Sequence, residues 1–178
     1  MFRLLHQIFK TGLVTEPLAP AEDSVVELVG ARLEKSIMKR FRGSLTIRMV
    51  DSGSCNACEL EAQAINNPIY NAERFGIHFT ASPRFADMLL VSGPVARNME
   101  IALRRTYESM PAPKLVVAIG DCARDGGIFG KSYASLGGVN RVIPVDAYIA
   151  GCPPEPSLIL GGILKVVEGA VEPLRKKY

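Results

Sequence analysis

KLVVAIGDCARDGGIFG, residues 114–130, is the stretch of this 178-residue chain that decides its fold. A short apolar run rich in β-branched residues ends at a glycine, and a polar loop that holds Cys122 follows. Such a run, bounded by turn signals, is typical of a buried strand in a parallel sheet. Equivalent runs predict further strands at residues 45–50, 77–81, 87–92 and 141–145.

Helix-like stretches fill the gaps between these runs. They lie at about residues 59–66, 96–109 and 156–169, where apolar residues recur at helical spacing. An alternation of strand and helix units is the pattern of sheets covered by helices on both faces. The sequence therefore predicts an α/β fold with a doubly wound, mostly parallel sheet over residues 44–170.

An amphipathic, basic extension over residues 1–43 precedes this domain, and a basic tail over residues 171–178 follows it. Apolar residues recur every three or four positions between 25 and 42, and six basic residues between 31 and 48 stand against one acid, Glu34. A cationic amphipathic helix suits an anionic membrane surface or an acidic partner. A solvated face of a helix packed on its own domain or on a sister subunit gives the same pattern.

Composition excludes several classes of protein. The net charge is only +3, and the aromatic content of 7% offers no stacking platform for nucleic acid. No window approaches the roughly 18 apolar residues of a membrane-spanning helix. His6, Gln7 and Lys10 interrupt the apolar N-terminus, so we expect no secretory signal and reduced thiols in the cytoplasm.

The four cysteines are the candidate functional residues. Cys55 and Cys58 follow the first predicted strand, Cys122 follows the strand that ends at residue 120, and Cys152 follows the last strand. Ligands of open α/β sheets bind beyond the carboxyl ends of the strands, where the loops converge. We therefore expect the four thiols to meet at that edge, although they come from three separate loops.

Four thiolates suit several kinds of site. A Cys-x-x-Cys pair with two further thiolates can bind a 4Fe-4S cluster or a structural zinc ion. Zinc usually takes its second pair from another tight Cys-x-x-Cys, whereas Cys122 and Cys152 stand alone, and this asymmetry favours the cluster. A thiol redox pair at Cys55 and Cys58, or four unconnected buried cysteines, are the remaining alternatives.

Four stretches carry a family resemblance: SCNACELE at 54–61, SPRFADMLLVSGPV at 82–95, ALRRTYESMPAPKLVVAIGDCARDGGIF at 102–129 and RVIPVDAYIAGCPPEP at 141–156. In them the chain resembles the small, cluster-bearing subunit shared by complex I and membrane-bound nickel-iron hydrogenases. The Cys-x-x-Cys spacing is similar to that of the hydrogenases rather than to the adjacent cysteines of complex I. Without a twin-arginine signal or second cluster domain, it looks like the energy-converting group 4 type of formate hydrogenlyase, homologous to the complex I 20 kDa (B) subunit.

The resemblance implies a flavodoxin-like domain with one proximal 4Fe-4S cluster, bound by Cys55, Cys58, Cys122 and Cys152. It implies an electron-transfer subunit of an oxidoreductase, peripheral on the cytoplasmic face of the cell membrane without a transmembrane helix. The implied partners are a large hydrogenase-like catalytic subunit holding the nickel-iron centre, a ferredoxin-like iron-sulfur subunit and membrane-arm subunits. No nucleic acid is expected among them.

Three charged residues take on meaning through the same resemblance. Glu61 corresponds to an acidic residue near the cluster that is suited to proton relay, and Glu59 is the alternative acid. Either is equally explained as a solvated carboxylate at a helix start, which the helix dipole favours. Arg84 corresponds to an arginine near the complex I cluster, where it would tune the potential, and its plain alternative is a surface charge.

Two rival functions remain open from the sequence. A quinone oxidoreductase of the complex I type would pass electrons from the same cluster to quinone. A zinc-stapled assembly module would have no redox role.

Overall fold

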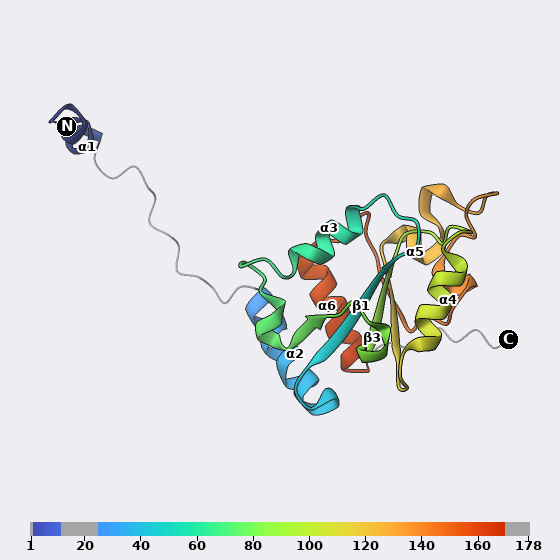
Figure 1. Ribbon diagram of the computed structural model, residues 1–178. Helices are drawn as coiled ribbons and strands as arrows, with labels where there is room; N and C mark the ends of the chain where they lie inside the picture. Colours follow the sequence, from blue (N-terminus) through green and yellow to red (C-terminus); the bar gives the residue numbers. More distant parts are fainter. Residues whose placement is uncertain (1, 12–24, 170–178) are drawn as a thin grey trace.

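A five-stranded sheet forms the centre of the protein, which is described by a computed structural model over residues 2–11 and 25–169 (Figure 1). The strand order is β2-β1-β3-β4-β5, and every pairing is parallel. The predicted doubly wound α/β fold is confirmed. The strands are β1 (Leu45–Asp51), β2 (Ile77–Phe79), β3 (Met88–Ser92), β4 (Leu115–Ile119) and β5 (Ala147–Ile149).

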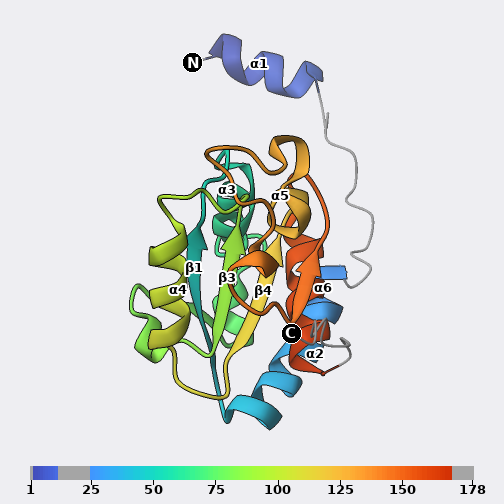
Figure 2. The same ribbon diagram turned by 90° about the vertical axis from the view of Figure 1, so that its right-hand side faces the viewer.

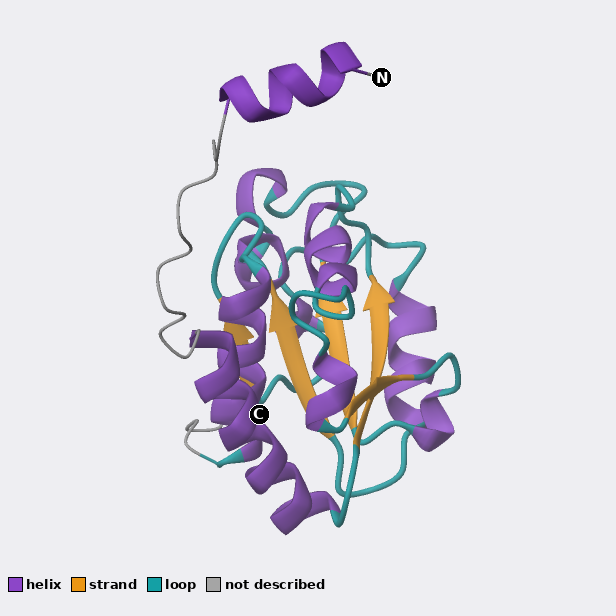
Figure 3. Ribbon diagram, turned by 90° about the vertical axis from the view of Figure 1, so that its left-hand side faces the viewer, coloured by secondary structure: helices purple, strands orange, loops and turns teal. Residues whose placement is uncertain are grey.

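Helices cover both faces of the sheet (Figures 2 and 3). One core cluster contains buried side chains of α2, α3 and α6, and the other contains side chains of α4 and α5. The α-helices are α1 (Phe2–Thr11), α2 (Val25–Phe41), α3 (Ala57–Ala64), α4 (Glu100–Ser109), α5 (Asp121–Asp125) and α6 (Pro156–Val167). Short 3₁₀ helices are η1 (Ala72–Phe75), η2 (Pro83–Phe85), η3 (Gly127–Phe129) and η4 (Val139–Arg141).

The central strand β3 shows why the apolar runs are continuous. All five of its residues are buried, with Met88 and Leu90 in one core cluster and Leu89 and Val91 in the other. Side chains of a strand alternate between the faces of the sheet, so a strand covered on both faces has a continuous apolar run, which in β3 ends at Ser92.

The predicted strand at 141–145 is wrong. That segment contains the end of η4 and an irregular stretch, and β5 begins only at Ala147. Pro144 has no N–H to donate to a ladder, and pairing with β4 starts at Asp146, whose N–H donates to the carbonyl of Val116. The apolar residues of this segment are buried in the core without being a strand.

Helix α2 packs against α6 and fills the core with its apolar stripe. Leu33 and Ile37 are fully buried. Two of its basic residues also bind within the chain: Arg40 donates to the carbonyls of Val166 and Val167, and Arg32 forms an ion pair with Glu168. The basic tail at 171–178 lies outside the described residues, and the division of the chain into three segments stays a prediction.

Candidate metal centre

Three loops at the carboxyl edge of the sheet carry the four cysteines. Cys55 lies in the loop after β1 and Cys58 in the first turn of α3, while Cys122 lies on α5 directly after β4. Cys152 follows β5. Figure 2 shows α3 and α5 beside each other at the upper ends of the strands. All four cysteines are free thiols.

Backbone hydrogen bonds hold the loops after β4 and β5 together. The N–H of Gly120 donates to the carbonyl of Ile149 over 2.8 Å, and the N–H of Asp121 donates to the carbonyl of Gly151 over 2.9 Å. These bonds continue the pairing of the two strands past their ends. Cys122 and Cys152 are the residues that follow Asp121 and Gly151, so the ladder itself brings their loops side by side.

Two glycines bring the backbone close to cysteine sulfurs. A Cβ added at Gly120 would lie 2.6 Å from Sγ of Cys58, and one added at Gly127 would lie 2.8 Å from Sγ of Cys122. Both glycines have positive φ, +85° and +51° respectively. Glycine at these positions therefore provides space that a side chain would fill, and backbone amides near the sulfurs can hydrogen-bond them.

The sulfurs influence one another electrostatically. Burial and, to a lesser extent, the charges of Glu59, Cys55, Cys122 and Cys152 together raise the pKa of Cys58 to about 12. Burial is also the largest cause that raises the pKa of Cys122, and the charges of Cys152 and Cys55 raise it as well. Four thiolates cannot gather without repulsion, so a positively charged metal centre is the group that would stabilise them.

We expect Cys58 to be the slowest of the cysteines to alkylate in the cluster-free chain. Only the thiolate reacts, and a raised pKa lowers its population at about pH 8. With the sulfur also buried, iodoacetamide should modify Cys58 at least about ten times more slowly than the exposed Cys55 and Cys152. Peptide mass spectrometry over time measures the rates. Equal rates would contradict the buried position of this thiol.

Glu59 is a buried carboxylate that joins two segments of the site. It is 8% exposed and accepts hydrogen bonds from the hydroxyls of Ser54 and Ser92. Ser54 directly precedes Cys55, and Ser92 ends β3. The carboxylate thus fixes the start of the Cys-x-x-Cys segment to the neighbouring strand. Neither serine could be identified as part of the site from the sequence, because nothing in the local pattern marks a serine as buried.

The other two charged candidates occupy different surroundings. Glu61 lies on α3, three residues after Cys58 and half-buried, on the same side of the helix as that cysteine. Arg84 is exposed on η2, which precedes β3 and contacts α4. The cysteines follow the carboxyl ends of the strands, whereas Arg84 precedes the amino end of one. Its tuning role therefore depends on the resemblance alone.

Apolar side chains are exposed on the cysteine-bearing segments. Leu60 is exposed on α3, and Ile128 and Phe129 are exposed on η3 after Cys122. Cys55 and Cys152 are exposed as well. We call Leu60, Ile128 and Phe129 the apolar rim, and exposed apolar side chains of this kind are suited to contact with another protein.

The donor set fits a cluster by its chemistry. Within residues 2–11 and 25–169, no three His, Cys, Asp or Glu side chains are grouped so as to hold a metal ion. An iron-sulfur cube is held by four cysteine thiolates. Four free cysteines within electrostatic range, with glycine backbone against two of them, are the residues such a group requires.

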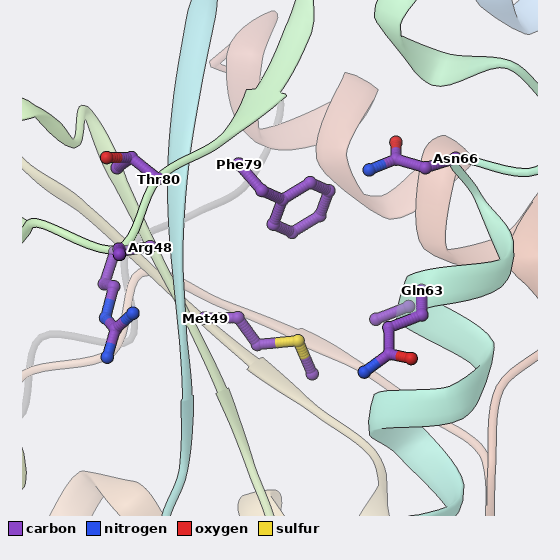
Figure 4. Close-up of a pocket in the computed structure, with 8 residues that line it drawn as sticks. Arg48, Met49, Gln63, Asn66, Phe79 and Thr80 are labelled. Carbon is purple, nitrogen blue, oxygen red and sulfur yellow. The ribbon is translucent and has the colours of Figure 1, made fainter.

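A separate hollow of about 380 Å³ lies between α3 and the β1–β2 edge of the sheet. Figure 4 shows Met49 and Phe79 pointing toward the side of Gln63 and Asn66, whereas Arg48 points to the other side of β1. Nε of Arg48 is buried without a hydrogen-bond partner among the described residues. No cysteine lines this hollow.

Comparison with known families gives one match that covers most of the site. The family model described as NADH ubiquinone oxidoreductase, 20 Kd subunit, matches residues 55–166. This range contains all four cysteines. The resemblance stated from the sequence is thereby confirmed at the level of the family.

Two curated relatives are also similar to this chain in sequence. The chain is 43% identical over 132 residues to Formate hydrogenlyase subunit 7 of Escherichia coli (strain K12), covering 74% of this chain and 52% of the relative. It therefore spans about half the length of that relative. It is 43% identical over 152 residues to the Probable membrane-bound hydrogenase subunit mbhJ of Pyrococcus furiosus, covering 80% of this chain and 91% of the relative.

A solved structure has a similar fold. A chain of the membrane-bound sulfane sulfur reductase (MBS), an archaeal respiratory membrane complex, matches with a TM-score of 0.63 and 36% identity. The match covers 77% of this chain and 74% of that chain. The similar proteins thus include parts of complexes named for different reactions.

Proposed function

We propose that this chain, which belongs to the family of the 20 kDa subunit of NADH ubiquinone oxidoreductase, is an electron-transfer subunit of a membrane-associated oxidoreductase. Cys55, Cys58, Cys122 and Cys152 would hold one 4Fe-4S cluster. Such a group accepts and releases one electron at a time, and the protein's part is to hold, orient and tune it. The gathering of four free thiols from three loops carries the proposal.

The surroundings of the cysteines support a relay between two proteins. Cys58 is buried against the domain, whereas Cys55 and Cys152 are exposed. The side bearing the exposed thiols would face a partner that covers the apolar rim of Leu60, Ile128 and Phe129. Burial of that rim would exclude water from the cluster and shorten the path for an electron.

The names of the relatives suggest which partners to seek. Formate hydrogenlyase and membrane-bound hydrogenase are the complexes to which those relatives are assigned. By analogy, a large subunit with a nickel-iron centre would exchange electrons with this chain, and a ferredoxin-like subunit would stand on the other side of the relay. Catalysis would then take place in the large subunit.

Membrane association would be peripheral, on the cytoplasmic face. Among the described residues, no helix combines the length and the apolar content needed to cross a bilayer. Membrane-arm subunits are therefore the expected attachment within the complex, because the relatives are named as parts of membrane-bound assemblies.

A quinone-reducing complex is the second candidate, and the hollow beside α3 favours it. Met49 and Phe79 give this hollow an apolar side, and Gln63 and Asn66 add amide groups, a combination that suits small amphipathic molecules. The sequence of the large subunit would distinguish the hydrogenase from the quinone-reducing complex. Cysteine pairs able to bind nickel near both of its ends would indicate hydrogenase activity.

Anaerobic purification of the full chain tests the proposal. We expect a brown protein with broad visible absorption and about four iron atoms per chain. A colourless chain containing zinc instead would support the assembly module and contradict an electron-transfer role. The paramagnetic resonance signal of the brown protein after reduction by dithionite would identify the cluster type.

A further inference from the structure

Helix α1 presents an apolar stripe to solvent. Phe2, Leu5 and Phe9 recur at spacings of three and four residues, which places them on one side of the helix. Phe2 is 87% exposed and Phe9 is 85% exposed. Exposure of large aromatic side chains in one stripe is unusual for a water-facing helix and marks a surface that another phase or molecule covers.

The polar side of α1 is cationic. Arg3 and Lys10 are seven residues apart, so two full turns bring them to nearly the same angle around the helix axis. The helix contains no acidic residue. Basic residues beside an aromatic and aliphatic stripe are the composition of helices that lie in the headgroup region of anionic membranes.

The length of α1 limits how the helix can be placed in a bilayer. Ten residues make a helix of about 15 Å, half the thickness of the hydrocarbon core. An isolated helix shorter than about 12 residues is also only marginally stable in water, so α1 gains stability when its stripe is buried. The helix therefore suits a position in the plane of the interface.

We propose that α1 docks the protein on an anionic lipid surface as an interfacial helix. The inference deepens the membrane association in the proposed function and rests on it for its biological setting. The thirteen residues 12–24 separate α1 from α2 and can span at most about 45 Å. The cysteine-bearing domain would thus stay within that reach of the bilayer.

Helix α2, the other basic amphipathic segment, is a poorer candidate. Its apolar residues Leu33 and Ile37 are buried against the sheet, and Arg32 and Arg40 already bind residues at the end of α6. The membrane role that the sequence assigned to residues 25–42 therefore fits α1 better.

Vesicle flotation of the full, anaerobically purified chain tests the proposal. Vesicles of phosphatidylcholine with about one third phosphatidylglycerol should bind the chain, and vesicles of phosphatidylcholine alone should bind it more weakly. The double variant Phe2→Ser and Phe9→Ser should weaken binding at least about tenfold. Raising the salt to about 0.5 M should weaken wild-type binding by screening Arg3 and Lys10.

Matched variants separate α1 from other surfaces. Lys35→Gln with Lys39→Gln removes exposed charge from α2, and Ile101→Ser removes an exposed apolar side chain from α4. Both should bind vesicles as the wild type does. Undiminished binding of the Phe2 and Phe9 variant overturns the proposal, as does loss of binding in the α2 variant alone.

Two further outcomes concern the occupant and the cluster. If the chain does not bind vesicles but requires Phe2 and Phe9 to assemble with its partner subunits, α1 docks on a protein surface and the lipid proposal is overturned. Iron content is measured on the same samples. If the chain is brown but does not bind vesicles, only the lipid docking of α1 is overturned. If the chain is colourless but binds vesicles through α1, the docking is supported and the proposed 4Fe-4S cluster is overturned.

Discussion

Cys122→Ser and Cys152→Ala are each expected to lose most of the iron from the chain. Each of these cysteines is the only one in its loop, so no neighbouring thiol can replace it. Cluster binding and folding of the loops are linked, because the ligands are ordered together with the group they hold. We therefore expect iron to fall from about four atoms per chain to less than about one.

Iron analysis and visible absorption of anaerobically purified variants measure this loss. Ala150→Ser is the matched control, because it places a hydroxyl on an exposed residue of the same loop as Cys152 without removing a thiol. It should retain its iron. A Cys122 or Cys152 variant that keeps four irons and its paramagnetic resonance signal would exclude that cysteine as a ligand.

Much of the fold could be predicted from local chemistry. Strands β3 and β4 are buried on both faces or nearly so, which makes their apolar runs continuous and easy to find. The last strand could not be predicted in the same way. Val142, Ile143 and Val145 are as apolar as a strand, but they fill a core beside a proline and do not pair.

The approach of the cysteines could also be predicted, because parallel strands end at one edge. What the sequence could not reveal is which neighbours support them. The link from Glu59 to Ser92 joins residues 33 apart, and contact between Gly120 and Cys58 joins different strands' loops. Such contacts depend on strand order, β2-β1-β3-β4-β5, and no local pattern records that order.

Gly120→Ala is expected to remove or distort the cluster through steric contact. Its φ of 85° and ψ of 159° lie in a region that only glycine adopts readily, and the added Cβ would lie 2.6 Å from Sγ of Cys58. Strain in this region costs about 1–3 kcal/mol. Backbone and sulfur must separate to relieve the contact, so Cys58 would leave the position in which the other thiols face it.

Gly130→Ala separates the two effects. Gly130 has φ of 52° and ψ of −152°, also a glycine-only conformation, but nothing lies within 4 Å of an added Cβ. Both variants should lose about 1–3 kcal/mol of folding free energy through backbone strain, which thermal unfolding measures. Only Gly120→Ala should also lose most of its iron or change its paramagnetic resonance spectrum. Equal iron content in the two variants, with unchanged spectra, would mean that contact between Gly120 and Cys58 does not shape the site. A parallel loss in both would instead assign the effect to strain in the loops, because that is the one property the two substitutions share.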